Sequence, residues 1–164
     1  MTDLIDKDKL LSKKDIDKIL GYPCKFVLYD DLCKIRNHNE LFDGFDNILL
    51  LYRTSENVGH WVGLKKIKNN VLFFDSFGMS VDDQLEHTPI NYRAELSKIL
   101  YNCPYTIHYN DTKFQDVNST VCGRYVALFF KYCTDINLFS KILKTASEYI
   151  EPDDLVCLLT QDDL

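Results

Sequence analysis

The chain has 164 residues, of which 46% are hydrophobic and 27% charged, proportions that are ordinary for one globular domain. Its 13% aromatic content, 6 glycines and 4 prolines exclude a disordered, collagen-like or low-complexity chain. The formal net charge of −6 argues against nucleic acid or an anionic membrane as the main partner. We therefore predict a single domain that spans residues 1–164 and buries a sizeable core.

The first predicted element is a short helix. Ser12 and Asp15 form a helix start signal, and Gly21 is a helix stop. Residues 25–29 have the composition of a strand or of a loop that crosses the core. Residues 48–52 form a continuous apolar run, which is typical of a strand buried on both faces.

An antiparallel hairpin is predicted next. Two apolar runs, residues 61–64 and 71–74, are separated by a turn at residues 68–70. The rest of the chain alternates between helical and strand patterns, and its expected elements are a helix over 92–101, a strand over 105–109, a buried helix over 122–133 capped by a preceding Ser or Thr, and helices over 138–149 and 155–159. This layout indicates a small sheet flanked by helices.

Six cysteines occur without any Cys-x-x-Cys pair, so we expect neither a disulfide framework nor a zinc site. No apolar stretch approaches the roughly 18 residues that a membrane span requires, and the polar opening does not resemble a signal peptide. These features predict reduced thiols in an intracellular compartment. Five of the cysteines are expected to be small core residues.

Cys122 differs from the other cysteines because it follows a polar loop and opens the predicted buried helix. Backbone amides at a helix N-terminus stabilise a thiolate, which favours nucleophilic chemistry. A cysteine nucleophile needs a base and an acceptor that orients the base. His60 begins one strand of the hairpin and Asp75 follows the other, so antiparallel pairing brings the two side chains together.

Two further residues complete the candidate site. Acyl transfer needs hydrogen-bond donors directed at the oxyanion, and Gln115, seven residues before Cys122, is a candidate side-chain donor. Gly123, next to the cysteine, is expected to keep the site open to an incoming carbonyl.

Three segments that contain these residues, 58–61, 73–78 and 115–123, resemble the adenain family and its relatives, the Ulp/SENP SUMO-peptidases. Members of that superfamily share a His-Trp pair, an acidic residue after a hydrophobic strand, a loop glutamine and a Cys-Gly pair that opens the central helix. The resemblance implies an α+β, papain-like cysteine peptidase fold. In this fold a small, mostly antiparallel central sheet is flanked by helices, and the nucleophile lies at the N-terminus of a buried helix.

The resemblance also implies a role for each matched residue. Cys122 would be the nucleophile, His60 the general base and Asp75 its orienting partner. Gln115 and the Cys122 amide would form the oxyanion hole. The residues implied to line the substrate cleft are Trp61 and Gly123. The adenoviral branch usually carries Glu at the acid position, whereas Asp75 matches the SUMO-peptidase branch.

The function implied is cleavage after small residues, at Gly-Gly or Gly-Xaa sites, by a viral maturation protease that processes capsid or other virion proteins in the virion and host cytoplasm. No metal or small-molecule cofactor is expected. Adenoviral relatives are activated by DNA and by a small peptide; the pI near 5.1 argues against the DNA cofactor and leaves a peptide activator open.

Three alternatives remain at this point. The first is removal of ubiquitin or a ubiquitin-like protein, because these modifiers also end in Gly-Gly. The second is acyl transfer from coenzyme A, which the lack of a basic cluster disfavours. The third is a catalytically dead virion scaffold, which the presence of the cysteine, histidine and acid together disfavours.

Overall fold

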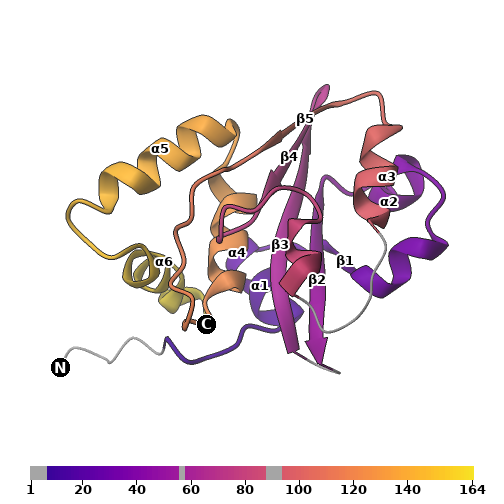
Figure 1. Ribbon diagram of the computed structural model, residues 1–164. Coiled ribbons are helices and arrows are strands. Elements are labelled where there is room, and N and C mark those ends of the chain that lie inside the picture. Colours follow the sequence, from indigo (N-terminus) through magenta and orange to yellow (C-terminus); the bar gives the residue numbers. More distant parts are fainter. Residues whose placement is uncertain (1–6, 56–57, 88–93) are drawn as a thin grey trace.

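The computed structural model describes residues 7–55, 58–87 and 94–164 and contains one five-stranded sheet with helices on both faces (Figure 1). The strands, which lie side by side in chain order, are β1 (Lys25–Leu28), β2 (Asn47–Ser55), β3 (Val58–Ile67), β4 (Asn70–Phe74) and β5 (Thr106–Tyr109). The helices are α1 (Lys13–Leu20), α2 (His38–Phe42), α3 (Glu95–Tyr101), α4 (Cys122–Tyr132), α5 (Ile136–Ala146) and α6 (Pro152–Thr160). The described residues also contain three short 3-10 helices, η1 (Tyr29–Lys34), η2 (Asp83–His87) and η3 (Gln161–Asp163). The expected α+β class, with a small sheet flanked by helices, is confirmed.

The sheet is antiparallel in its middle and parallel at both edges. The pairs β2–β3 and β3–β4 are antiparallel, so the predicted hairpin is present. The edge strands β1 and β5 run parallel to β2 and β4. Parallel pairing requires a crossover connection, and here the crossovers contain α2 and α3. The sequence does not reveal these edge pairings, because they join segments separated by helices.

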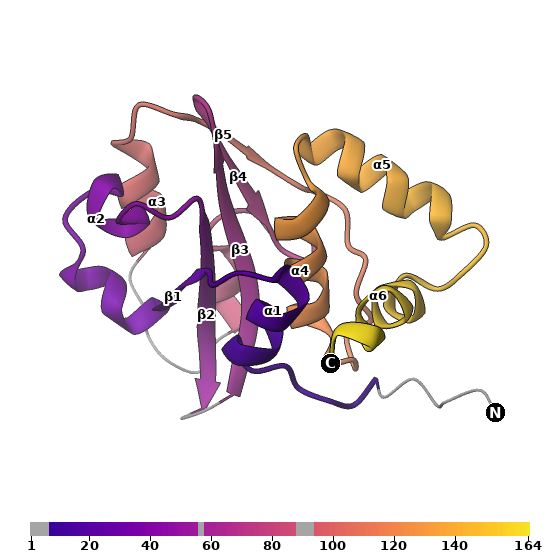
Figure 2. The same ribbon diagram turned by 180° about the vertical axis from the view of Figure 1, so that it is seen from behind.

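Strand β2 shows why this part of the sequence is continuously apolar. Leu49 packs into a cluster with residues of α1, α4, α5 and α6, whereas its neighbours Ile48 and Leu50 pack into a second cluster with residues of η1, α2 and α3. Figures 1 and 2 show these two groups of helices on opposite faces of the sheet. Because both faces are covered, successive side chains are all buried.

Helix α4 packs directly against β3, and Gly63 permits the close approach. A Cβ atom at Gly63 would lie 2.9 Å from a ring carbon of Phe130 and 3.0 Å from side-chain atoms of Phe129 and Val126. The strand that carries His60 and the helix that begins at Cys122 are therefore held in direct contact.

The helix boundaries partly match the sequence signals. Ser12 and Asp15 form a capping box at the start of α1, and Gly21 ends it in the left-handed conformation, with φ of 82°, as expected. The cap predicted for α4 is wrong, because Val121 is the N-cap residue and makes no side-chain cap hydrogen bond. The nearby Thr120 hydroxyl instead donates to the Lys7 carbonyl at 3.3 Å.

Other boundaries also shift. The helix predicted over 92–101 is observed from Glu95, and residues 92–93 lie outside the described residues. Helix α6 begins at Pro152, three residues before the expected start, with the proline in its first turn. None of the helices in the described ranges is long and apolar enough to cross a membrane.

Candidate active site

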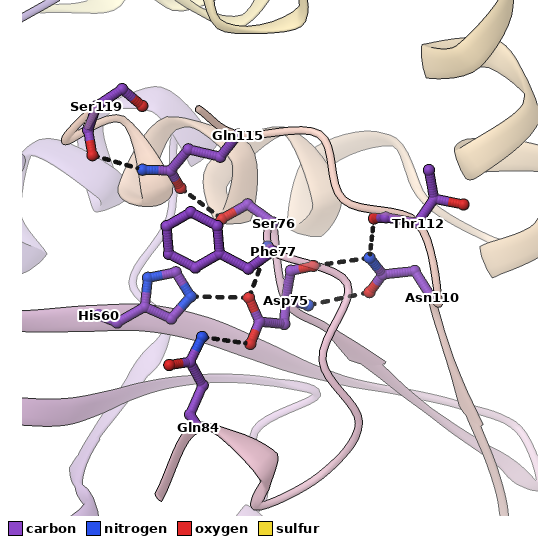
Figure 3. Close-up of polar contacts among 9 residues, drawn as sticks. All are labelled: His60, Asp75, Ser76, Phe77, Gln84, Asn110, Thr112, Gln115 and Ser119. Carbon is purple, nitrogen blue, oxygen red and sulfur yellow. Dashed lines mark hydrogen bonds and ion pairs between the residues drawn. The ribbon is translucent and has the colours of Figure 1, made fainter. Parts of the chain in front are cut away.

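His60 and Asp75 meet where strand β4 ends. The last β3–β4 pair is Gly63 with Phe74, so His60 lies beyond the end of β4, and the loop that follows β4 carries Asp75 toward it. The imidazole Nε2 is 2.8 Å from Asp75 Oδ1 (Figure 3). The contact predicted from the hairpin is therefore present.

The Asp75 carboxylate is fully buried, and donors satisfy both of its oxygens. Besides the contact with His60, Oδ1 accepts the Phe77 backbone N–H at 2.8 Å, and Oδ2 accepts the Gln84 side-chain amide at 3.0 Å. Asn110 fixes the Asp75 backbone, since its side chain accepts the Asp75 N–H at 3.0 Å and donates to the Asp75 carbonyl at 2.7 Å. The buried carboxyl group therefore has a hydrogen-bond partner on each oxygen, as a buried polar group requires.

Phe77 covers the imidazole ring. The two rings stack with centroids 4.7 Å apart and an interplanar angle of 25° (Figure 3). Gly78 then turns the chain with φ of 72°, and a Cβ there would lie 2.6 Å from the Thr112 carbonyl carbon. The turn after Asp75 therefore requires glycine, and it holds Phe77 over His60.

Cys122 is the first residue of α4 and is 5% exposed. Burial lowers the pKa of His60, but hydrogen bonds with the Asp75 carboxylate and the Cys122 thiol raise it by more, from 6.5 to about 10. The imidazole therefore lies between an acid and a thiol and favours its protonated form. Because Nε2 faces Asp75, Nδ1 is the ring nitrogen left to exchange a proton with the thiol.

Gln115 is 2% exposed and links the segment containing the acid to the loop before the cysteine. Its Oε1 accepts the Ser76 hydroxyl at 2.6 Å, and its Nε2 donates to the Ser119 carbonyl at 2.9 Å (Figure 3). The side-chain amide has two N–H bonds, of which Ser119 accepts one. Gln115 is thus held in place seven residues before Cys122.

The two residues predicted to bind substrate have different surroundings. Trp61 lines a groove and donates its indole N–H to the Leu11 carbonyl at 3.1 Å. A Cβ at Gly123 would lie 3.1 Å from Leu11 and 3.3 Å from Trp61. The absent side chain at Gly123 thus leaves room for Leu11 and Trp61, and the expectation that Gly123 keeps the site open to an incoming carbonyl stays a prediction.

Two grooves are lined by candidate site residues, one by Trp61 and the other by Gln115. The first, called here the Trp61 groove, has a volume of about 640 Å³ and is lined by Leu10, Leu11, Ser12, Lys13, Phe26, Leu28, Leu51, Arg53, Val58, Gly59 and Trp61. The second, called here the Gln115 groove, has a volume of about 520 Å³ and is lined by Lys7, Asp8, Lys113, Phe114, Gln115, Asp116, Asn118, Ser119, Glu151, Pro152 and Asp153. The segment before α1 contributes to both.

The other cysteines differ from Cys122 in their environments, and all six are free thiols. Cys24, Cys133 and Cys157 are buried as expected, and burial is the main cause that raises the pKa of Cys24 and Cys133 to about 12. The core assignment is wrong for Cys33, which is exposed, and for Cys103, which is partly exposed. Across residues 7–55, 58–87 and 94–164, no three His, Cys, Asp or Glu side chains gather as a metal site would require.

Sequence reasoning missed three residues around the acid: Phe77, Gln84 and Asn110. Phe77 belongs to the Asp-Ser-Phe-Gly segment but gave no signal for stacking on a histidine. Asn110 follows Tyr109, which pairs with Phe73 in parallel register, so Asn110 and Asp75 leave the same edge of the sheet. The proximity of Asn110 to Asp75 can therefore be inferred only when the pairing of β4 with β5 is known.

The comparisons with known proteins give one sequence relative and several structural neighbours. The chain matches no protein-family model. It is 32% identical to the uncharacterized protein V9 of Sputnik virophage, in an alignment 164 residues long that covers 92% of this chain and 93% of that protein.

The structural neighbours are more distant. The central domain of the uncharacterized Lpg1148 protein from Legionella pneumophila aligns with a TM-score of 0.47 at 12% identity, covering 94% of this chain and 96% of that one. The Ulp1 protease domain in complex with Smt3, the yeast ortholog of SUMO, aligns with a TM-score of 0.40 at 14% identity, covering 96% and 80%. The adenain side of the resemblance stays a prediction.

Proposed function

We propose that this chain, which belongs to the family of the uncharacterized protein V9 of Sputnik virophage, is a cysteine peptidase with Cys122 as its nucleophile. The observation that carries the proposal is that one buried imidazole, His60, interacts with both the Asp75 carboxylate and the Cys122 thiol. In nucleophilic catalysis by cysteine, a base takes the thiol proton and a third group orients the base, and these three residues fit those roles.

In the proposed reaction His60 holds the proton that leaves the Cys122 thiol. The Cys122 sulfur attacks the scissile carbonyl carbon, a C–S bond forms, and the carbonyl oxygen becomes an oxyanion. We assign the Cys122 backbone N–H and the second N–H of the Gln115 amide as its donors. The C–N bond then breaks, and the leaving amine takes the proton from His60. Water, deprotonated by His60, hydrolyses the thioester and releases the acid product.

The substrate class that we propose is a polypeptide with small residues before the scissile bond, of the Gly-Gly or Gly-Xaa type. Two observations support it. Cys122 and His60 are only 5% and 9% exposed, so a bulky side chain at the reacting carbonyl would meet protein atoms. The Trp61 groove is lined by Gly59 and Trp61, the chain neighbours of His60, and we assign its apolar side chains to the residues that precede the bond.

The biological role that we propose is maturation of capsid or other virion proteins, with action in the virion and host cytoplasm. The virophage relative supports a viral setting, because the two proteins match over nearly their full lengths. The acidic net charge of −6 disfavours DNA as an activator, whereas a peptide activator is compatible with both grooves. No metal or small-molecule cofactor enters the proposed reaction.

Removal of a ubiquitin-like modifier is the second candidate. It is favoured by aspartate rather than glutamate at position 75, since that choice resembles the SUMO-peptidase branch. The chemistry at Cys122 would be the same, and only the recognised protein would differ.

The test compares the wild type with Cys122→Ala and with Cys33→Ala, a matched control that removes an exposed thiol. Each protein is incubated with fluorogenic Gly-Gly-Xaa peptides and with ubiquitin and SUMO probes that carry an electrophilic C-terminus. Peptide cleavage that only Cys122→Ala abolishes, without a probe adduct, supports the maturation protease. A probe adduct on Cys122 supports the modifier peptidase. Silence of the wild type in both assays, with an unreactive Cys122, supports the inactive scaffold.

A further inference from the structure

We propose that Gln84 is a positioning residue that holds the Asp75 carboxylate in the orientation in which it accepts from His60. Gln84 lies in η2, outside the three segments that carry the family resemblance, and its effect on catalysis rests on the proposed function. Its effect on His60 does not depend on that function.

The contact is direct and buried. Gln84 is 6% exposed, and its Nε2 donates to Asp75 Oδ2 at 3.0 Å (Figure 3). The orientation of the amide is fixed by chemistry, because an ionised carboxylate can only accept hydrogen bonds. Since Oδ1 already receives His60 and the Phe77 N–H, Gln84 supplies the contact to the other oxygen.

The turn that carries Gln84 is anchored independently of the site. Asp82, which has φ of 69°, accepts the Tyr29 hydroxyl at 2.6 Å and the Tyr52 hydroxyl at 3.3 Å through Oδ1. Its Oδ2 accepts the Ser97 backbone N–H at 2.8 Å. One carboxylate therefore ties the start of η2 to η1, β2 and α3. These hydrogen bonds of Asp82 fix the position of the turn that carries Gln84, two residues later.

The two oxygens of Asp75 thus have separate partners, and this arrangement fixes the plane of the carboxylate. Without Gln84, Oδ2 would lose its donor, and the carboxylate would keep only the contacts of Oδ1 with His60 and the Phe77 N–H. The pair would then bind its proton more tightly, so the apparent pKa of His60 should rise. Asp75 and Cys122 are the titratable groups that act on the ring, and Phe77, which covers it, is neutral.

The test measures the His60 titration by NMR in histidine-labelled protein, in a Cys122→Ala background that removes the second group acting on the ring. Gln84→Met removes the donor at similar volume, and Gln84→Asn keeps the amide on a shorter side chain. Glu86→Gln is the control, since Glu86 is an exposed residue of the same turn. The His60 signal is assigned by its loss in His60→Gln.

We expect the apparent pKa of His60 to rise by about one unit in both Gln84 variants, a tenfold change in proton affinity, and to stay constant in Glu86→Gln. An unchanged pKa, or a fall toward the ordinary value of a solvated histidine, overturns the proposal. In the Cys122-containing protein we expect kcat for peptide cleavage to fall by about tenfold, with little change in KM. If the wild type cleaves no peptide, the proposed function fails, and the titration still decides the role of Gln84.

Discussion

The imidazole of His60 and the carboxylate of Asp75 are separated by 15 residues in the sequence and by 2.8 Å in space. The contact arises because β3 continues past the end of β4. The residue after β4 can then turn across the strand end, where the Gly78 turn and the Asn110 side chain hold it. His60 and Asp75 thus come from one local hairpin, whereas Cys122 comes from α4, which is distant in the sequence.

Replacing Asp75 with asparagine should abolish the proposed peptidase activity while keeping the shape of the side chain. Asparagine has only one acceptor oxygen, so it cannot accept from both Gln84 and His60, and it no longer balances an imidazolium. We expect kcat/KM for peptide cleavage to fall by at least about 10²-fold. Asp83→Asn, at an exposed position in η2, serves as the control. Activity of Asp75→Asn within a factor of two of wild type would contradict this role.

Gly63→Ala should destabilise the protein by overpacking the contact between β3 and α4. The added methyl group would lie 2.9 to 3.0 Å from Phe130, Phe129 and Val126, and all three are buried. We expect the free energy of unfolding in urea to fall by about 1–3 kcal/mol. Gly123→Ala, whose nearest contact would be 3.1 Å, should cost less. A Gly63→Ala protein as stable as wild type would show that α4 does not pack as closely as described.

Stability should decrease with rising pH between 6.5 and 10 because of His60. The folded state raises the pKa of this imidazole to about 10, so it binds the proton more tightly than the unfolded chain does. The stabilisation is fully present below pH 6.5 and is lost as the pH rises through 10. We expect a difference of the order of a few kcal/mol.

The measurement is the free energy of unfolding in urea as a function of pH, for the wild type and for His60→Gln. Subtracting the two curves removes the groups that titrate in both proteins. A difference curve that is flat, or that rises, across this range would contradict the assigned charge state of His60.

The parts of the fold that sequence reasoning predicted are those with local signals. The Ser12 capping box, the hairpin turn and the His60–Asp75 contact all depend on residues within about one hairpin of each other. The parts it missed depend on tertiary pairing: the parallel edge strands, the Asn110 clamp, and Gln84, which reaches Asp75 from a turn anchored by Asp82. The approach of Leu11 to Gly123 was missed for the same reason, since Leu11 comes from the segment before α1.

The most direct test of the account is the alkylation rate of each cysteine by iodoacetamide at pH 7, followed by mass spectrometry. Cys33 and Cys103 are the internal references, since they are exposed and partly exposed. We predict that Cys122, although 5% exposed, reacts at least about tenfold faster than Cys33 and that His60→Ala removes this advantage. A Cys122 that reacts more slowly than Cys33, at a rate that His60→Ala leaves unchanged, would contradict a nucleophilic cysteine at this site.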